Sequence, residues 1–197
     1  MVNSRRIAPA IPTFGIVNSD DFQPGTYPKK RLMIRDVFLV RHAKSNWDYP
    51  HLRDIERPLN DRGLRDAPRM AKYFADLGLH PDIIISSPAV RALTTAAFFK
   101  VELDIEGEDF WVRDQIYEGS ASTLLQLIQL LPEGVERPVI FGHNPGFTMF
   151  ANHFPGGDFM NVPTCGIVHY QADISHWGEF GPGSVKVVAH YFPKEVL

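Results

Sequence analysis

The chain has 197 residues, of which 44% are hydrophobic and 22% charged, and this composition excludes collagen-like, coiled-coil and strongly disordered proteins. The 20 basic residues against 23 acidic ones give a net charge of −3, so we expect no nucleic-acid partner. No apolar stretch approaches the roughly 20 residues that cross a bilayer, and we expect a cytoplasmic protein without membrane contact. A single cysteine, Cys165, excludes an internal disulfide and is expected to be buried rather than reactive.

Residues 1–33 differ from the rest because proline and glycine interrupt every periodic pattern, and we expect an extended or disordered arm there. Five basic and two acidic residues give this arm a charge of +3. They leave 15 basic and 21 acidic residues, or −6, for residues 34–197, the predicted folded domain. Met33 lies eight residues before Arg41 and is an alternative start, so residues 1–32 are either a genuine tail or no part of the native protein.

From residue 36 onward, short apolar runs alternate with helical stretches. Strands are predicted at 36–40, 81–85, 110–116, 138–141, 166–171 and 185–191. Helices are predicted at 61–77, 88–100, 121–131 and 146–153. Asn60 and Ser120 suit the N-caps of the first and third helices, and Gly78 suits the end of the first. This alternation predicts an α/β fold, a three-layer α/β/α sandwich around a mostly parallel central sheet.

Polar residues stand where the predicted strands end. Arg41 and His42 follow the first strand, and Arg91 lies just beyond the second. Glu118 follows the third strand and His143 the fourth. In open α/β sheets ligands bind beyond the carboxyl ends of the strands, so we expect these side chains to converge on one edge.

This set of residue types suits phosphoryl transfer, in which catalysis depends on positioning and on neutralising the charge of the phosphate oxygens. Arginine grips two oxygens with a planar fork that keeps its charge. A histidine with one neutral ring nitrogen can accept the phosphoryl group as a nucleophile, and a second, protonated histidine can stabilise that group during transfer. None of the eight histidines lies two to four residues from another, the spacing typical of zinc sites, and we expect neither a metal nor another cofactor.

Four blocks of the sequence resemble, in the same order, those of the histidine phosphatase superfamily, whose fold is phosphoglycerate mutase-like. They are 38–45 (FLVRHAKS), 58–63 (PLNDRG), 86–92 (SSPAVRA) and 142–146 (GHNPG), and the resemblance covers about residues 34–192. The segment AKSNWD after His42 is similar to the SixA-like branch, the phosphohistidine phosphatases. The resemblance implies that His42 is the phosphorylated nucleophile. Its phosphate pocket would consist of Arg41, Arg91 and His143.

Further side chains are candidates for the same site. Glu118 is either the acid that protonates the leaving group or an exposed carboxylate before a helix. A phosphohistidine substrate needs less help from an acid than a phosphate ester, because its N–P bond is weak and its leaving group is an imidazole. Lys44, Ser45 and Asn46 either bind phosphate from the loop after His42 or are solvated.

The activity implied by the resemblance is that of a metal-independent phosphatase with a phosphohistidine enzyme intermediate, acting on phosphohistidine of a partner protein. The alternatives are a phosphatase for a small phosphorylated metabolite and an inactive module that binds a phosphoprotein. The charged loop at residues 47–57 is either the rim that meets a protein substrate or simply a charged surface. A cysteine-dependent tyrosine phosphatase is disfavoured because Gln171, and not arginine, stands six residues after Cys165.

Overall fold

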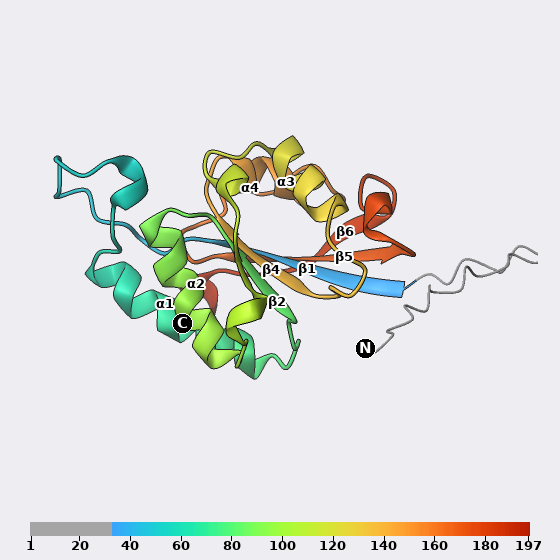
Figure 1. The fold of residues 1–197 in the computed structure, drawn as a ribbon, viewed down its shortest axis with the longest axis horizontal. Helices are drawn as coiled ribbons and strands as arrows, with labels where there is room; N and C mark the ends of the chain where they lie inside the picture. The colour runs from blue at the N-terminus through green and yellow to red at the C-terminus, as the bar shows by residue number, and fades with distance from the viewer. Residues whose placement is uncertain (1–32) are drawn as a thin grey trace, which may run out of the picture. The chain divides into compact units, whose positions relative to one another are not determined.

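A computed structural model describes residues 33–197, so residues 1–32 of the predicted arm (1–33) lie outside the described residues. The described chain forms a six-stranded sheet in the order β3-β2-β4-β1-β5-β6 (Figure 1). The strands are β1 (Met33–Arg41), β2 (Ile83–Ser86), β3 (Phe110–Val112), β4 (Pro138–Gly142), β5 (Ile167–Ile174) and β6 (Val185–Tyr191).

The sheet is mixed and mostly parallel, as predicted. Strands β3, β2, β4 and β1 are parallel neighbours, whereas β5 runs antiparallel to β1 and β6 antiparallel to β5. Arg41 lies opposite Gly142 in the register of β1 and β4, and Ser86 lies opposite Phe141 in that of β2 and β4. The carboxyl ends of these three central strands therefore finish at the same edge.

Helices cover both faces of this sheet and confirm the three-layer prediction (Figure 1). They are α1 (Asp61–Asp76), α2 (Val90–Glu102), α3 (Ala121–Gln129), α4 (Gly146–Ala151) and α5 (Pro193–Val196). Alternate residues of β1 serve the two faces because side chains alternate along a strand. Val37 and Leu39 pack with α3 and α4, and Phe38 and Val40 pack with α1 and α2. None of the helices in the described part of the chain is long and apolar enough to cross a bilayer.

The predicted helix boundaries are confirmed where the capping chemistry is local. The Asn60 side chain accepts a hydrogen bond from the Gly63 amide at 2.9 Å, and Ser120 accepts one from the Thr123 amide at 3.2 Å. Each caps an otherwise unpaired amide in the first turn of its helix. Gly78 ends the α1 region with a φ of +66°, a left-handed conformation that favours glycine.

Several element lengths differ from the prediction. The predicted strand at 110–116 ends at Val112, because the chain turns into a 3₁₀ helix at Asp114–Ile116 (η4) that buries Ile116. The first strand begins at Met33 rather than at residue 36, so Met33 belongs to β1 and not to the arm. Its added length pairs with β5, which itself extends to Ile174. The remaining 3₁₀ helices are η2 (Asp54–Glu56), η3 (Gly107–Asp109) and η5 (Trp177–Glu179).

Candidate active site

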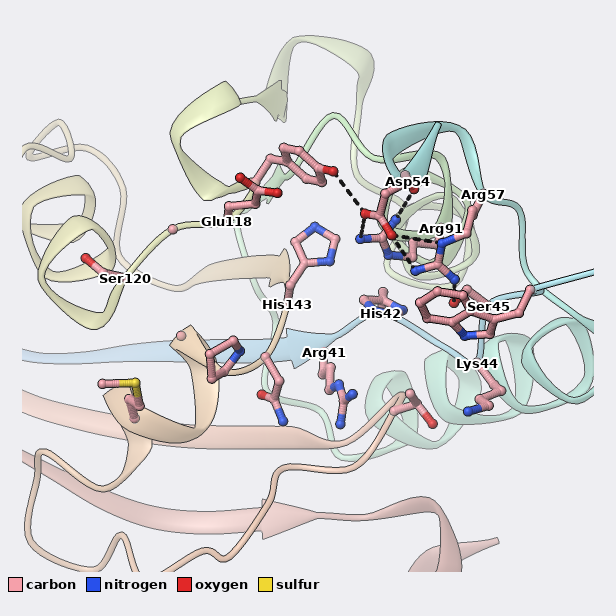
Figure 2. Close-up of a pocket in the computed structure, with 18 residues that line it drawn as sticks. Arg41, His42, Lys44, Ser45, Asp54, Arg57, Arg91, Glu118, Ser120 and His143 are labelled. Carbon is pink, nitrogen blue, oxygen red and sulfur yellow. Dashed lines mark hydrogen bonds and ion pairs between the residues drawn. The ribbon is translucent and has the colours of Figure 1, made fainter. Parts of the chain in front are cut away.

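A cavity of about 630 Å³ opens at the carboxyl ends of β1, β2 and β4, where the sequence predicts the site. It is lined by Arg41 and His42 from the end of β1, by Arg91 from the first turn of α2, and by His143 after β4. Figure 2 shows His42 between the two arginines, with His143 to one side of it. The structure therefore brings together the four side chains that the motifs predict.

His42 is held in one orientation by the backbone. Its amide donates to the Gly142 carbonyl at 3.0 Å, and its ring Nδ1 lies 2.7 Å from the Ala43 carbonyl oxygen. A carbonyl only accepts hydrogen bonds, so Nδ1 carries the proton and Nε2 keeps a free lone pair. Burial lowers the pKa of His42, the hydrogen bond to the Ala43 carbonyl partly opposes this, and the charges of His143, Arg91 and Arg41 add to the lowering, so that the pKa is about 3. His42 is thus a neutral imidazole at physiological pH.

His143 faces His42 across the cavity, with 5.0 Å between the ring centroids. Its Nε2 lies 2.8 Å from the Ser87 hydroxyl, whereas its Nδ1 is buried without a hydrogen-bond partner within the protein. Burial lowers the pKa of His143 to about 3, with the charge of Arg91 as the next cause. The ring is therefore neutral until an anion enters beside it, and an anion would favour its protonated form.

The two arginines are anchored through their terminal nitrogens, Arg41 through Nη1 alone and Arg91 through both. Arg41 Nη1 donates to the Val162 carbonyl at 2.7 Å and to Asn161 Oδ1 at 3.2 Å. Arg91 Nη1 and Nη2 both donate to Asp54, to its backbone oxygen at 2.6 Å and to Oδ2 at 2.9 Å. The Nε atoms of both arginines are buried without a hydrogen-bond partner within the protein.

These unpaired groups are concentrated at the site. Five buried side-chain polar atoms in the described chain lack a partner, and three of them are Arg41 Nε, Arg91 Nε and His143 Nδ1. Buried polar groups are normally satisfied, and an unsatisfied one costs free energy. All three belong to side chains that line the cavity, and an oxyanion bound there would offer these side chains acceptor oxygens, in charge-assisted hydrogen bonds for the arginines.

Asp54 is the functional-site residue that the sequence analysis placed only in a charged loop. Its Oδ1 accepts from Arg57 Nε at 2.9 Å and Nη2 at 2.7 Å, and its Oδ2 accepts from Arg91 Nη2 and from the Tyr117 hydroxyl, both at 2.9 Å. Burial alone would raise the pKa of Asp54, but the hydrogen bonds from Arg57 and Tyr117 and the charge of Arg91 lower it to about 2. The one sequence signal is the spacing of Asp54 and Arg57, which a tight turn brings into contact.

The other candidates are placed less directly. Ser45 lines the cavity, and its hydroxyl accepts from Arg57 Nη1 at 2.8 Å. Asn46 is absent from the cavity lining, and its side chain accepts from the Asp48 amide at 2.7 Å. Exposed Lys44 lines the cavity. None of these contacts tests whether Ser45 and Asn46 bind phosphate, and that role stays a prediction.

Glu118 lines the mouth of the cavity as an exposed residue with a φ of +57° (Figure 2). Its left-handed backbone turns the chain between η4 and α3, and its role as an acid stays a prediction. Cys165 is buried as predicted, and burial raises the pKa of its thiol, so it remains protonated and unreactive. Within residues 33–197 no group of three histidine, cysteine or acidic side chains is arranged to hold a metal ion.

The fold and the site define an α/β protein with a cationic pocket around a neutral imidazole at the edge of its sheet. Residues 37–118 match the model of the histidine phosphatase superfamily, branch 1. An uncharacterised chloroplastic protein of Arabidopsis thaliana is 30% identical over 165 residues, which cover 78% of this chain and 75% of that relative. The chain belongs to the histidine phosphatase superfamily.

Solved structures agree with this assignment. A structure described as the phosphohistidine phosphatase SixA of Agrobacterium tumefaciens is 28% identical, with a TM-score of 0.67 over 80% of this chain and 97% of that one. The protein histidine phosphatase SixA in complex with tungstate has a TM-score of 0.70 at 21% identity, over 82% of this chain and 99% of that one. The fold is therefore the phosphoglycerate mutase-like fold of the SixA proteins.

Proposed function

We propose that this protein is a metal-independent phosphatase that transfers a phosphoryl group to His42 and then to water. The observation that carries the proposal is the set of three unpaired nitrogens, on Arg41, Arg91 and His143, around a neutral imidazole. The two guanidinium groups would hold the equatorial oxygens, and His143, protonated once the anion arrives, would stabilise the charge on the transferring group.

The reaction would proceed in two displacements. In the first, the Nε2 lone pair of His42 forms a bond to phosphorus while the bond to the leaving group breaks, and the leaving group keeps that electron pair and takes up a proton. In the second, a water oxygen attacks phosphorus, the P–Nε2 bond breaks, and its electron pair returns to His42 while the water proton passes to solvent or phosphate. Covalent catalysis of this kind divides one difficult hydrolysis into two easier steps.

The substrate we propose is phosphohistidine on a partner protein. The SixA relatives are described as phosphohistidine phosphatases, and this supports the same substrate class here. Glu118, the candidate acid, is exposed, and its carboxylate makes no hydrogen bond or ion pair within the described chain. Hydrolysis of phosphohistidine would depend less on such a loosely held acid than hydrolysis of a phosphate ester, because the imidazole leaving group accepts a proton readily from solvent.

The proposal is tested by measuring phosphate release from a phosphohistidine protein, a phosphoserine peptide and a sugar phosphate. We expect the phosphohistidine protein to be hydrolysed fastest and the wild-type enzyme to form an acid-labile phosphoenzyme. The variant His42→Ala should lose both, with kcat at least about 10⁴-fold lower, because it lacks the nucleophile. His153→Ala, a change at an exposed histidine outside the cavity, is the matched control and should keep wild-type activity.

Each outcome separates the alternatives. Fastest release from the sugar phosphate would favour a metabolite phosphatase, and binding of the phosphohistidine protein without any turnover would favour an inactive binding module. Phosphate release that persists in His42→Ala would show that His42 is not the nucleophile and would refute the proposed mechanism.

A further inference from the structure

The Asp54 carboxylate lies at the edge of the candidate active site, near the start of α2 (Figure 2). It accepts hydrogen bonds from Arg57, Arg91 and the Tyr117 hydroxyl. We propose that Asp54 is a positioning residue that orients Arg91 toward the transferring phosphoryl group and, as a fixed anion, weakens the binding of the free oxyanion. This inference rests on the proposed phosphatase activity and assigns a role to a residue that is neither nucleophile nor phosphate ligand.

Arg91 depends on Asp54 for its orientation. Asp54 supplies both hydrogen-bond acceptors that Arg91 has within residues 33–197, a backbone oxygen at 2.6 Å and Oδ2 at 2.9 Å. With both terminal nitrogens bonded to Asp54, the guanidinium plane is fixed in the lining of the cavity, and its Nε has no partner within the protein. An arginine in the first turn of a helix opposes the helix dipole, so a neighbouring carboxylate also offsets an unfavourable placement. A long, flexible side chain is thus converted into a preorganised donor.

Asp54 is itself held from the loop side. Arg57 donates two hydrogen bonds to Oδ1, and its third nitrogen donates to the Ser45 hydroxyl at 2.8 Å. The guanidinium carbon of Arg57 lies 3.6 Å from the centroid of the Trp47 ring. Tyr117, which follows η4 and also lines the cavity, donates to Oδ2. The carboxylate is therefore fixed by contacts from two separate segments of the chain.

The position of this carboxylate has two opposite consequences. It aligns Arg91 for the transition state, but it also places a negative charge in the lining of a cavity that receives an anion. Binding of a free inorganic oxyanion depends mainly on the positive charge of the cavity. Stabilisation of the transition state depends on that charge and also on the exact orientation of the donors. Neutralising Asp54 should therefore lower kcat and at the same time tighten the binding of a free oxyanion. Damage to the fold would weaken both.

The test compares Asp54→Asn, Tyr117→Phe and the matched control Asp48→Asn, measuring kcat and KM on phosphohistidine protein and Kd for tungstate by calorimetry. Asp48 is exposed in the same loop and absent from the cavity lining, so its variant removes the same charge without touching Arg91. For Asp54→Asn we expect kcat to fall by about tenfold to hundredfold, as for a misplaced catalytic group. Its tungstate Kd should fall by about threefold to tenfold, because one repulsive charge is gone.

Tyr117→Phe keeps the charge of Asp54 and removes one of its hydrogen bonds. It should lower kcat by about threefold, because Asp54 loses one hydrogen bond. The tungstate Kd should stay within twofold of wild type, because the charge is unchanged. Asp48→Asn should match wild type in both measurements.

The inference is overturned if Asp54→Asn retains kcat within twofold of wild type, or if its kcat and its tungstate affinity fall together, since a parallel loss marks a structural role. A tighter tungstate Kd in Asp48→Asn would also overturn it, because the effect would then belong to the net charge of the loop. If the wild-type protein releases no phosphate from any substrate, the proposed function fails. The tungstate measurement alone would then still show whether Asp54 opposes an anion.

Discussion

His42 and His143 are fixed by the sheet, whereas Asp54 and Arg57 stand in a loop that leaves the sheet after β1 and returns at α1. The two histidines are each 8% exposed, and hydrogen bonds from backbone or from Ser87 hold them. In contrast, the Asp54 side chain is 47% exposed and depends on other side chains for its position. The proposed nucleophile is thus positioned by the sheet, whereas both hydrogen bonds of the Arg91 guanidinium go to a residue of a surface loop.

The base of this loop is nevertheless narrow and well defined. The Asn46 amide donates to the Pro58 carbonyl at 2.8 Å, and the Asn60 amide donates to the Lys44 carbonyl at 3.0 Å. A methyl group at Gly63 would collide with that same Lys44 carbonyl, so glycine is needed where α1 passes the loop. The contrast between the two regions therefore concerns the tip of the loop, which carries Asp54. This contrast predicts that substitutions of the two histidines beside the sheet alter both stability and catalytic rate. Substitutions at the tip of the loop should alter the catalytic rate with little effect on stability.

The largest expected effect follows from the buried histidines. The pKa values of His42 and His143 are lowered to about 3, whereas a histidine in the unfolded chain titrates near 6.5. The unfolded state therefore binds more protons between these values, and the free energy of unfolding falls as the pH decreases through that window. From pH 7 to pH 5 we expect a loss of about 2 kcal/mol for each histidine, measured by urea unfolding.

Single variants show how much of this loss of unfolding free energy comes from each histidine. His42→Asn and His143→Asn should each show a pH dependence shallower by the contribution of one histidine. Asp54, with a pKa of about 2, stays ionised throughout the interval and contributes nothing to the slope. An identical slope in wild type and both variants would contradict the prediction.

The next effect concerns Arg91, which lines the cavity together with the two histidines and donates hydrogen bonds to Asp54 of the loop. Arg91→Lys keeps the positive charge but loses the planar fork, so it loses the paired contact with Asp54 and the proposed donor for the phosphoryl oxygens. We expect kcat/KM on the phosphohistidine protein to fall by about 100-fold, with little change in the urea midpoint.

Arg62→Lys is the matched control for this change. Arg62 is an exposed arginine of α1 that pairs with Asp66 and lies outside the lining of the active-site cavity. It should retain kcat/KM within twofold of wild type. If Arg91→Lys retains more than a third of wild-type kcat/KM, its bidentate geometry is not needed for the reaction.

Much of the fold follows from local signals in the sequence. Asn60, Ser120 and Gly78 act where their side-chain and backbone chemistry predicts, because caps and left-handed turns depend on a few adjacent residues. Strand lengths were predicted less well. The start of β1 at Met33 depends on its pairing with Ile174 of β5, and such a distant contact leaves no mark in the local pattern.

The candidate site divides in the same way. His42 and His143 were predictable because each follows an apolar strand, and the strands meet at one edge of a parallel sheet. The contacts of Asp54 were not predictable, since its partners Arg91 and Tyr117 lie 37 and 63 residues away along the chain. Its local spacing to Arg57 predicts only an ion pair. Contacts between a loop and distant elements depend on the packing of the whole domain.

The smallest expected effect lies at the tip of the loop, at Trp47. Trp47 is 69% exposed, and its ring stacks on Arg57, which in turn holds Asp54. Trp47→Ala removes a cation–π contact worth about 0.5–1 kcal/mol and should change the free energy of unfolding by no more than that. Because Arg57 then holds Asp54 less firmly, kcat should fall by about threefold, while Trp47→Phe, which keeps an aromatic face, should restore most of the loss.

A second stacked pair in the molecule provides the control for this prediction. The guanidinium carbon of Arg113 lies 4.8 Å from the centroid of the Trp111 ring, on the edge strand β3 and outside the cavity lining. Trp111 also packs against the core, so Trp111→Ala should destabilise the protein more than Trp47→Ala does and yet leave kcat unchanged. An equal loss of kcat in both variants would mean that stability, and not the position of Asp54, sets the rate. A loss confined to Trp47→Ala would show that the tip of the loop acts on the chemistry through Arg57 and Asp54.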